Sequence, residues 1–374
     1  MKKNLSIVGV GIVIILGLFF VFKNQASNVK SSEHVSSESH ESQKHQPVKK
    51  VVTTKKHTSS KLSESSQSEK VNRHKQASKQ VIALEKNNNE ALSQAITTQM
   101  ATVLPSTHGP ARWTAYVEEV GGQGLKTSVT NWEPAKSQFS ASTIKLFILI
   151  RYYQLCQSGQ LNPDDTYVLQ KKDMVQGSGT MLNDPVGTKY TLQELCNLMI
   201  EQSDNIATNV LIDEVGGFSA VNRTITSVVG PKHQSSLERK MMDTSNIENG
   251  RANRINAKEA AQTLLQLYQG KVIDPTTDAQ MLSLMLKTKN RTKLPSQLPA
   301  GAICYNKSGE SNYRGIENDM ALIKYNGHVF AMCVLIEMDG EGETPIDATI
   351  EQTQSEVNAI GNIGQAVTNV IAAS

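Results

Sequence analysis

The sequence predicts an α+β fold, an α/β sandwich that combines a sheet with a helical subdomain. Strand-like segments occur before and after a mainly helical stretch at about 145–290. Helical patterns also occupy both ends of the ordered chain, at 81–104 and 350–372. Each apolar face must be covered by another layer. We therefore expect one antiparallel sheet of about five strands, flanked by N- and C-terminal helices, with the helical subdomain inserted.

Order is expected to begin near Val81. Apolar residues recur at helical spacing from there to residue 104, and Pro105 ends the pattern. Residues 112–120 and 125–131 then predict two strands around the glycine-rich turn that separates them.

A buried helix is predicted from Ser142 to about residue 158. Residues 146–150 are apolar on every side, which is typical of a helix inside the domain. Ser142 and Lys145 lie three residues apart and share one face of the first turn. Free N–H groups at a helix N-terminus can hold a developing oxyanion, and a desolvated lysine can take the serine proton. The spacing alone is common, so its meaning depends on the rest of the chain.

The middle and the end of the chain divide into helices and strands. Helices are predicted to begin at a capping box at 191–194 and to cover 207–217 and 257–268. Residues 231–256 are polar with little periodicity and predict a long loop, which inside a compact domain is usually functional or mobile. The remaining strands are expected at 302–308, 316–325 and 328–338, with Asn326-Gly327 as the hairpin turn between the last two.

Composition is that of a soluble enzyme with 374 residues, 38% hydrophobic and 5% aromatic. The formal net charge of +3 hides an asymmetry, because residues 24–80 carry eleven Lys or Arg against five Asp or Glu. Residues 1–23 add three lysines, which leaves 81–374 at about −6. A mildly acidic domain gives no support to a nucleic-acid partner.

The N-terminal segment, residues 1–23, predicts a membrane anchor or a secretory signal. Lys2 and Lys3 precede an uncharged apolar run at 6–22, which is near the minimum length for a span. Residues 22–26 lack the two small residues of a usual cleavage site, so we favour an uncleaved single-pass anchor in the cell membrane. The lysines place the domain outside the cell, and cleavage would make it secreted.

Residues 24–80 predict a disordered tether. They are rich in Ser, Lys and His, contain no aromatic residue, and cannot bury enough apolar surface to offset the entropy of ordering. Such a chain spans roughly 40 Å as a coil and on the order of 190 Å when extended. The tether therefore suits a domain, at 81–374, that is held on a membrane and works in or beyond a cell wall.

The four cysteines are Cys156, Cys196, Cys304 and Cys333, and they lack metal-ligand spacing. Export would permit a disulfide, for which Cys156 with Cys196 is the first pair to test. Four buried thiols that act as small apolar side chains are the open alternative.

Three motifs stand in order along the chain: Ser-Thr-Ile-Lys at 142–145, Ser-Asp-Asn at 203–205 and Lys-Ser-Gly at 307–309. This combination is characteristic of class A β-lactamases and penicillin-binding proteins. Residues 81–374 resemble that serine hydrolase family, and the resemblance implies an active site between the sheet and the helical subdomain. The intervals, the glycine-turned hairpin before the serine and the Arg-Gly-Ile at 314–316 resemble the class A branch.

The resemblance implies a role for each catalytic residue. Ser142 would be the nucleophile and Lys145 its base. Ser203 would relay the proton to the leaving nitrogen, and Asn205 would bind the acylamide side chain of the substrate. The N–H groups of Ser142 and Glu310 would form the oxyanion hole, with the Glu310 carboxylate repelling an anionic substrate unless it turns away.

The resemblance also implies a site for the substrate carboxylate. Lys307 and Ser308 would attract it, with Gly309 completing the motif, and the charge of Lys307 would keep Lys145 deprotonated. Arg314, expected on the next strand, is the natural second partner of that carboxylate. A surface salt bridge is the alternative for Arg314.

The residues expected to release the acyl group depart from the family pattern, in which a Glu-x-x-x-Asn motif activates the water that hydrolyses the acyl-enzyme. Glu238 falls ninety-six residues after the nucleophile, close to the expected interval, but Met242 stands in the place of the asparagine. Counting back from the following helix instead puts Lys240 in the glutamate's place. Glu238 is kept as the candidate for deacylation, with an ion pair to Arg239 or Arg251 as the alternative.

Three functions remain open from the sequence. The first is a β-lactamase-like serine hydrolase that forms an acyl-enzyme on Ser142 and hydrolyses β-lactam amides. The second is a penicillin-binding D,D-peptidase acting on cell-wall D-alanyl peptides, and the third is a sensor that is acylated without turnover. Residues 176–179 stand where many β-lactamases place an aromatic residue, which opens the site and leaves its substrate less defined. No cofactor or metal is expected, and the domain is expected to be a monomer.

Overall fold

The computed structural model describes residues 89–104, 111–121, 125–133, 136–243, 245–246, 250–338 and 348–374. The apolar run at 6–22 and the tether at 24–80 lie outside the described residues, so anchor and tether stay predictions. None of the described helices has the length and apolar character needed to cross a membrane.

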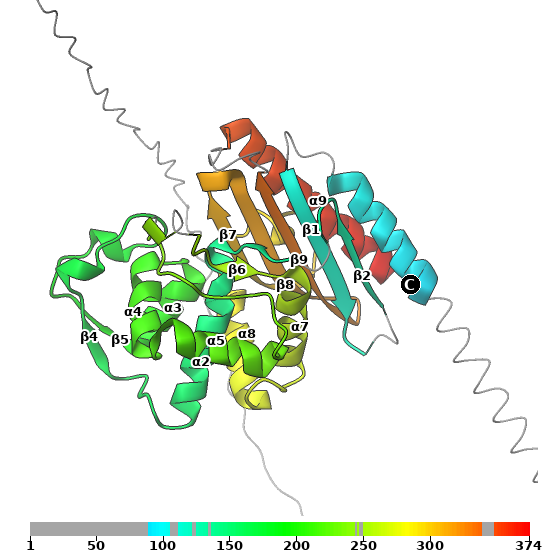
Figure 1. Cartoon of the computed structure of the whole chain (residues 1–374). Coiled ribbons are helices and arrows are strands. Elements are labelled where there is room, and N and C mark those ends of the chain that lie inside the picture. Colours follow the sequence, from blue (N-terminus) through cyan, green and yellow to red (C-terminus); the bar gives the residue numbers. More distant parts are fainter. Residues whose placement is uncertain are drawn as a thin grey trace, which may run out of the picture. The chain divides into compact units, whose positions relative to one another are not determined.

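A five-stranded antiparallel sheet forms the centre of the described domain (Figure 1). Its order is β2-β1-β9-β8-β7, so strands from before and after the helical stretch join in one sheet. The β8–β9 turn has φ of 49° at Asn326 and 84° at Gly327, as its sequence predicts. The predicted sheet is confirmed, and its strands are β1 (Ala111–Glu119), β2 (Lys126–Thr130), β7 (Ile303–Ser311), β8 (Ile316–Tyr325) and β9 (His328–Met338).

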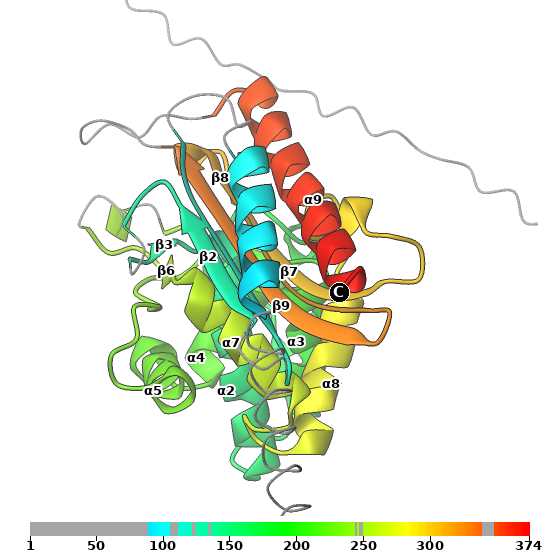
Figure 2. The same cartoon turned by 90° about the vertical axis from the view of Figure 1, so that its right-hand side faces the viewer.

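Both faces of this sheet are buried. Successive side chains of a strand point to opposite faces, so Met332 of β9 enters one core while Cys333 enters the other. The helix at 89–103 and α9 (Ile350–Ala372) cover the first face, where Figure 2 shows them side by side. The helical layer covers the second face, which completes the predicted sandwich.

The helical layer is built around α2, whose residues from Leu146 to Ile150 are at most 1% exposed. Helix α3 starts with the predicted capping box between Thr191 and Glu194. The helices of this layer are α2 (Lys145–Gln157), α3 (Leu192–Glu201), α4 (Asn205–Glu214), α5 (Gly217–Val229), α7 (Ala257–Tyr268) and α8 (Pro275–Leu286).

The remaining elements are short. Two small antiparallel pairs join β3 (Gln138–Phe139) to β6 (Arg254–Ile255) and β4 (Thr166–Val168) to β5 (Lys189–Thr191). Strand β6 lies inside the region predicted as a loop. The 3₁₀ helices are Ala141–Ile144, Lys171–Asp173, Met181–Asn183, Leu294–Gln297 and Tyr313–Gly315.

The cysteines of the domain are not cross-linked. All four cysteines are free thiols in the structure, so the disulfide between Cys156 and Cys196 that export would permit is not formed in it. Burial raises the pKa of the Cys196 thiol well above its ordinary value.

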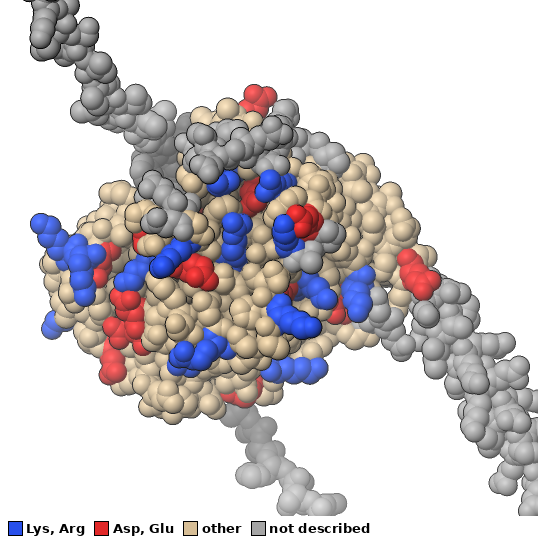
Figure 3. All heavy atoms as spheres, in the orientation of Figure 1, with Lys and Arg blue, Asp and Glu red and all other residues tan. Residues whose placement is uncertain are grey.

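The face of the domain in Figure 3 carries positive and negative side chains interspersed.

Candidate active site

The three sequence motifs meet at one hydroxyl group. The Nζ atom of Lys145 donates to Ser203 O at 2.6 Å, to Ser203 Oγ at 3.1 Å and to Asn205 Oδ1 at 3.1 Å. From the edge strand β7, Lys307 Nζ donates to the same Ser203 Oγ at 3.0 Å. The two lysines therefore lie within hydrogen-bond distance of the same hydroxyl group, Lys145 from α2 and Lys307 from β7. The fold thus joins the starts of α2 and α4 to β7 at Ser203.

The backbone is strained beside both serines of the site. Ser142 lies in the 3₁₀ helix that precedes α2, and Ala141 immediately before it has a φ of 43°. Ser203 has a φ of 57°. Residues with a side chain rarely adopt this left-handed region, which costs about 1–3 kcal/mol and persists where surrounding contacts impose it.

Asp204 supplies such contacts. One carboxylate oxygen accepts hydrogen bonds from Thr180 N at 2.8 Å and Met181 N at 2.9 Å, while the other caps α4 by accepting from Ala207 N at 2.9 Å. Asp204 is buried, at 1% exposure. Asp204 therefore holds the Ser-Asp-Asn turn in place against the preceding loop.

The pKa values of the two lysines are both lowered, and their surroundings explain how. Complete burial lowers the pKa of Lys145 well below its ordinary value, and the positive charge of Lys307 lowers it further. Burial also lowers the pKa of Lys307, to about 8, but the carboxylates of Glu310 and Asp319 oppose that shift. Lys145 can therefore accept a proton near neutral pH, while Lys307 still carries its charge.

Strand β7 passes directly beside the backbone of Ser142. A Cβ atom at Gly309 would lie 2.8 Å from both Ser140 O and Ser142 N. Only glycine permits so close an approach. The Ser142 side chain itself is partly exposed, whereas Lys145 is fully buried. The glycine of the third motif therefore lets the sheet contact the backbone of Ser142.

Ser308 and Glu310 lie on either side of Gly309 in β7. Ser308 is 1% exposed, and its Oγ has no hydrogen-bond partner in the part of the chain that the structure describes. The Glu310 carboxylate is bound by Lys293 Nζ at 3.1 Å and by Asn290 Nδ2 at 3.3 Å. Burial opposes ionisation of Glu310, but the charges of Lys293 and Lys307 lower its pKa to about 2. Glu310 is therefore an ion-pair partner of Lys293.

Arg314 lies elsewhere than predicted. It is in the 3₁₀ turn Tyr313–Gly315 with a φ of 63°, and β8 begins only at Ile316. Its guanidinium carbon lies 5.0 Å from the centre of the Phe139 ring. The prediction that Arg314 lies on the strand is wrong, because the chain must reverse between two paired strands at this position.

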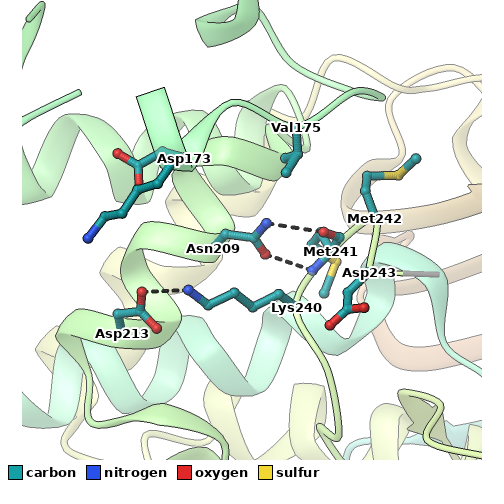
Figure 4. Close-up of a pocket in the computed structure, with 9 residues that line it drawn as sticks. Asp173, Val175, Asn209, Asp213, Lys240, Met241, Met242 and Asp243 are labelled. Carbon is teal, nitrogen blue, oxygen red and sulfur yellow. Dashed lines mark hydrogen bonds and ion pairs between the residues drawn. The ribbon is translucent and has the colours of Figure 1, made fainter. Parts of the chain in front are cut away.

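The long loop presents methionine to the site. A Cβ atom at Gly177 would lie 2.5 Å from Asn205 Nδ2 and 3.2 Å from Met242 Sδ, so the thioether and the amide share one neighbour. Asn209, one turn after Asn205 on α4, clamps Met241 through both its N and its O, at 2.6 and 3.1 Å (Figure 4). Asn205 and Asn209 are one helical turn apart, and this spacing could have indicated Asn209 as a residue of the site, although no motif contains it.

A backbone hydrogen bond holds Glu238 in the loop. Its N–H donates to Asn253 Oδ1 at 2.8 Å. Within the described residues its carboxylate forms no hydrogen bond or ion pair, so neither Arg239 nor Arg251 is its partner there. The carboxylates that act on the pKa of Lys145 are instead those of Asp204 and Glu310. A deacylating role for Glu238 stays a prediction.

A pocket of about 240 Å³ lies beside this loop (Figure 4). Lys240 reaches across it to Asp213 Oδ2 at 2.6 Å, so Lys240 is paired at the surface. The described ranges contain no cluster of His, Cys, Asp and Glu suited to a metal ion. The pocket is lined by Lys172, Asp173, Val175, Asn209, Asp213, Lys240, Met241, Met242 and Asp243.

Comparison with known proteins agrees with this geometry. The model of the Beta-lactamase enzyme family matches residues 91–371, and the chain belongs to this family. A "Beta-lactamase" of Rhodobacter capsulatus is 30% identical over 145 residues, which cover 38% of this chain and 48% of that protein. The chain spans about half the length of the curated relatives it matches first.

Two solved structures share the fold. The beta-lactamase from Sphaerobacter thermophilus DSM 20745 has a TM-score of 0.60 and 26% identity, covering 73% of this chain and 95% of that one. A mutant of PBP-A, solved as an acyl-enzyme complex with penicillin-G, has a TM-score of 0.63 and 19% identity, covering 76% and 97%.

Proposed function

We propose that the domain is a serine hydrolase that is acylated by β-lactams on Ser142 and hydrolyses them. The observation that carries the proposal is the convergence of Lys145 and Lys307 on Ser203 Oγ. Family membership of residues 91–371 supports the same chemistry.

The reaction begins at Ser142. Its Oγ attacks the β-lactam carbonyl carbon while its proton passes to the neutral amine of Lys145. The negative charge that develops on the carbonyl oxygen is held by the N–H groups of Ser142 and Glu310. The C–N bond then breaks, the ring nitrogen receives a proton from Ser203 Oγ, and Lys145 returns a proton to Ser203. An ester on Ser142 results.

Lys307 and Ser308 would orient the substrate. The buried Ser308 Oγ lacks a partner in the described structure, and a carboxylate oxygen could accept its proton. The ammonium group of Lys307 lies next to it and bonds to Ser308 O at 2.8 Å. Recognition of a carboxylate at this point would set the β-lactam carbonyl beside Ser142.

A second candidate is a penicillin-binding D,D-peptidase that acts on cell-wall peptides. The side chain that the long loop presents beside Gly177 is the thioether of Met242, which cannot activate water. Release of a penicilloyl ester would then depend on Glu238, whose carboxylate is not bonded to the site. The PBP-A mutant, which shares the fold, was captured as such an acyl-enzyme with penicillin-G.

One time course separates these functions. The full chain and the variants Ser142→Ala and Glu238→Gln are incubated with a fluorescent penicillin, and covalent label is followed. Label that appears and then disappears in the wild type, but persists in Glu238→Gln, supports β-lactam hydrolysis. Label that persists in both supports the peptidase or the sensor. The proposal fails if the wild type takes no label, or if Ser142→Ala labels equally.

We further propose that the domain is a monomer tethered outside the cell membrane and reaching the cell wall. The support is the Lys-flanked apolar run at 6–22 and the polar composition of 24–80. Protease added to intact cells should release the domain, and deletion of residues 1–23 should retain it inside. Sedimentation of 81–374 at the monomer mass would support the oligomeric state.

A further inference from the structure

Lys293 is a buried cation that no sequence motif marks. It precedes the 3₁₀ helix Leu294–Gln297 and is 1% exposed. Its Nζ donates to Gly309 O at 3.2 Å and to Asn318 O at 3.2 Å. It also forms ion pairs with Glu310 at 3.1 Å and with Glu317 at 2.6 Å. The group is therefore held between the edge strand of the sheet and its neighbour.

The carbonyl that Lys293 binds belongs to a particular peptide unit. Gly309 C=O and the Glu310 N–H are the two ends of one planar trans peptide, so they point in opposite directions. The structure contains no cis peptide among its described residues. A cation that fixes the carbonyl on one side therefore fixes the direction of the N–H on the other. It also polarises the unit, which strengthens the N–H as a donor.

We infer that Lys293 is a positioning residue for the oxyanion hole. It orients and polarises the Gly309–Glu310 peptide so that the Glu310 N–H faces the carbonyl oxygen of a substrate on Ser142. The inference rests on the proposed acylation of Ser142 and adds a residue to it.

Lys293 also neutralises a negative charge next to this peptide. An unpaired Glu310 carboxylate would place a negative charge one residue from the N–H that must receive an oxyanion. Lys293 neutralises it at 3.1 Å. Burial disfavours the charge of Lys293, but Glu310 and Glu317 outweigh burial and raise its pKa above the ordinary value. The charge is therefore present at every pH at which the enzyme would work.

A merely structural ion network must be distinguished from this role. Glu317 provides the matched control, because its carboxylate pairs with the same Nζ at 2.6 Å, and no hydrogen bond joins that carboxylate to the Gly309–Glu310 peptide within the described residues. Glu317→Gln disturbs the network and keeps the cation on the peptide. Lys293→Met removes the cation with little change in shape. Lys293→Met combined with Glu317→Gln removes one buried charge of each sign, which protects folding.

The test measures the ester that penicillin forms on Ser142. In the full chain the infrared band of the acyl-enzyme carbonyl reports the hydrogen bonds in the oxyanion hole, since stronger donors lower its frequency. We expect the band to move to higher frequency in Lys293→Met and in the double variant. We expect the acylation rate constant to fall about tenfold, less than the roughly 10²–10³-fold cost of deleting an oxyanion donor outright. Lys293→Arg should restore part of both.

The outcomes are distinct. An unchanged band in both Lys293 variants overturns the inference while leaving the proposed function intact. A shift in Glu317→Gln as large as that in Lys293→Met also overturns it, because the effect then belongs to the network. A wild type that takes no label from penicillin overturns the proposed function, and the role of Lys293 with it.

Discussion

Lys145 and Lys307 donate to one oxygen atom, Ser203 Oγ, from 3.1 and 3.0 Å. Two buried ammonium groups this close repel each other, so the fold favours the state in which only one of the two amines is charged. Lys307 retains its charge because Glu310 and Asp319 act on it. In the proposed function, Lys145 is therefore the base for Ser142 and Lys307 is the cation for the substrate carboxylate.

Lys145→Arg should abolish most acylation. A guanidinium group stays protonated in proteins and cannot accept the Ser142 proton. The acylation rate constant with a fluorescent penicillin should fall by about 10²–10⁴-fold, the usual contribution of a general base. Lys136→Arg, at an exposed surface pair, serves as the control and should label at the wild-type rate. Comparable labelling by both variants would contradict the role of Lys145.

Acylation by an anionic β-lactam should decline above pH 8. The pKa of Lys307 is lowered to about 8, so the ammonium group that attracts the substrate carboxylate is lost as the pH rises through that value. Rate constants measured from pH 6 to 10 should show the decline for the free acid and not for its methyl ester. In Lys307→Arg the decline should move to higher pH. The same decline with the ester would show that another group titrates.

Gly309→Ala should damage both stability and acylation. The added methyl group would lie 2.8 Å from Ser140 O and from Ser142 N, so the strand or the 3₁₀ helix must move. We expect a loss of about 1–3 kcal/mol in the free energy of unfolding in urea, the usual cost of overpacking. Ser311→Ala on the same strand should change it by less than about 0.5 kcal/mol. A stable, fully active Gly309→Ala would refute the close approach.

Glu356→Gln should stabilise the protein most at alkaline pH. Glu356 on α9 is 0% exposed, and both its carboxylate oxygens lack a partner among the described residues. Burial raises its pKa to about 8, so between pH 4.5 and 8 the unfolded chain releases a proton that the folded chain keeps. The wild type should therefore lose stability as the pH rises, by up to about 1.4 kcal/mol per pH unit.

Urea unfolding at pH 5, 6.5 and 8 measures this dependence. Glu356→Gln should remove most of the slope, whereas Glu351→Gln, at an exposed position of the same helix, should keep it. Parallel slopes in the wild type and Glu356→Gln would assign the pH dependence to other carboxylates.

Local elements were predictable because neighbouring residues decide them. The turn at Asn326-Gly327 requires two positive φ values, which these residues adopt readily. The capping box at Thr191 fixes the start of α3. Helices α5 and α8 were not separated in advance, although Asp274 and Pro275 are a cap and a first-turn proline that mark the start of α8.

The sequence by itself determined the layers of the fold and the residue types of the site, since periodicity and motif order are local properties. Only the tertiary structure decided how far the pKa of each lysine is lowered, because that depends on burial and on charges brought from distant strands. It moved Arg314 into a turn, set Met242 beside Gly177, and bound Lys293 to the Gly309–Glu310 peptide. These are contacts between residues far apart in the chain, and no spacing encodes them.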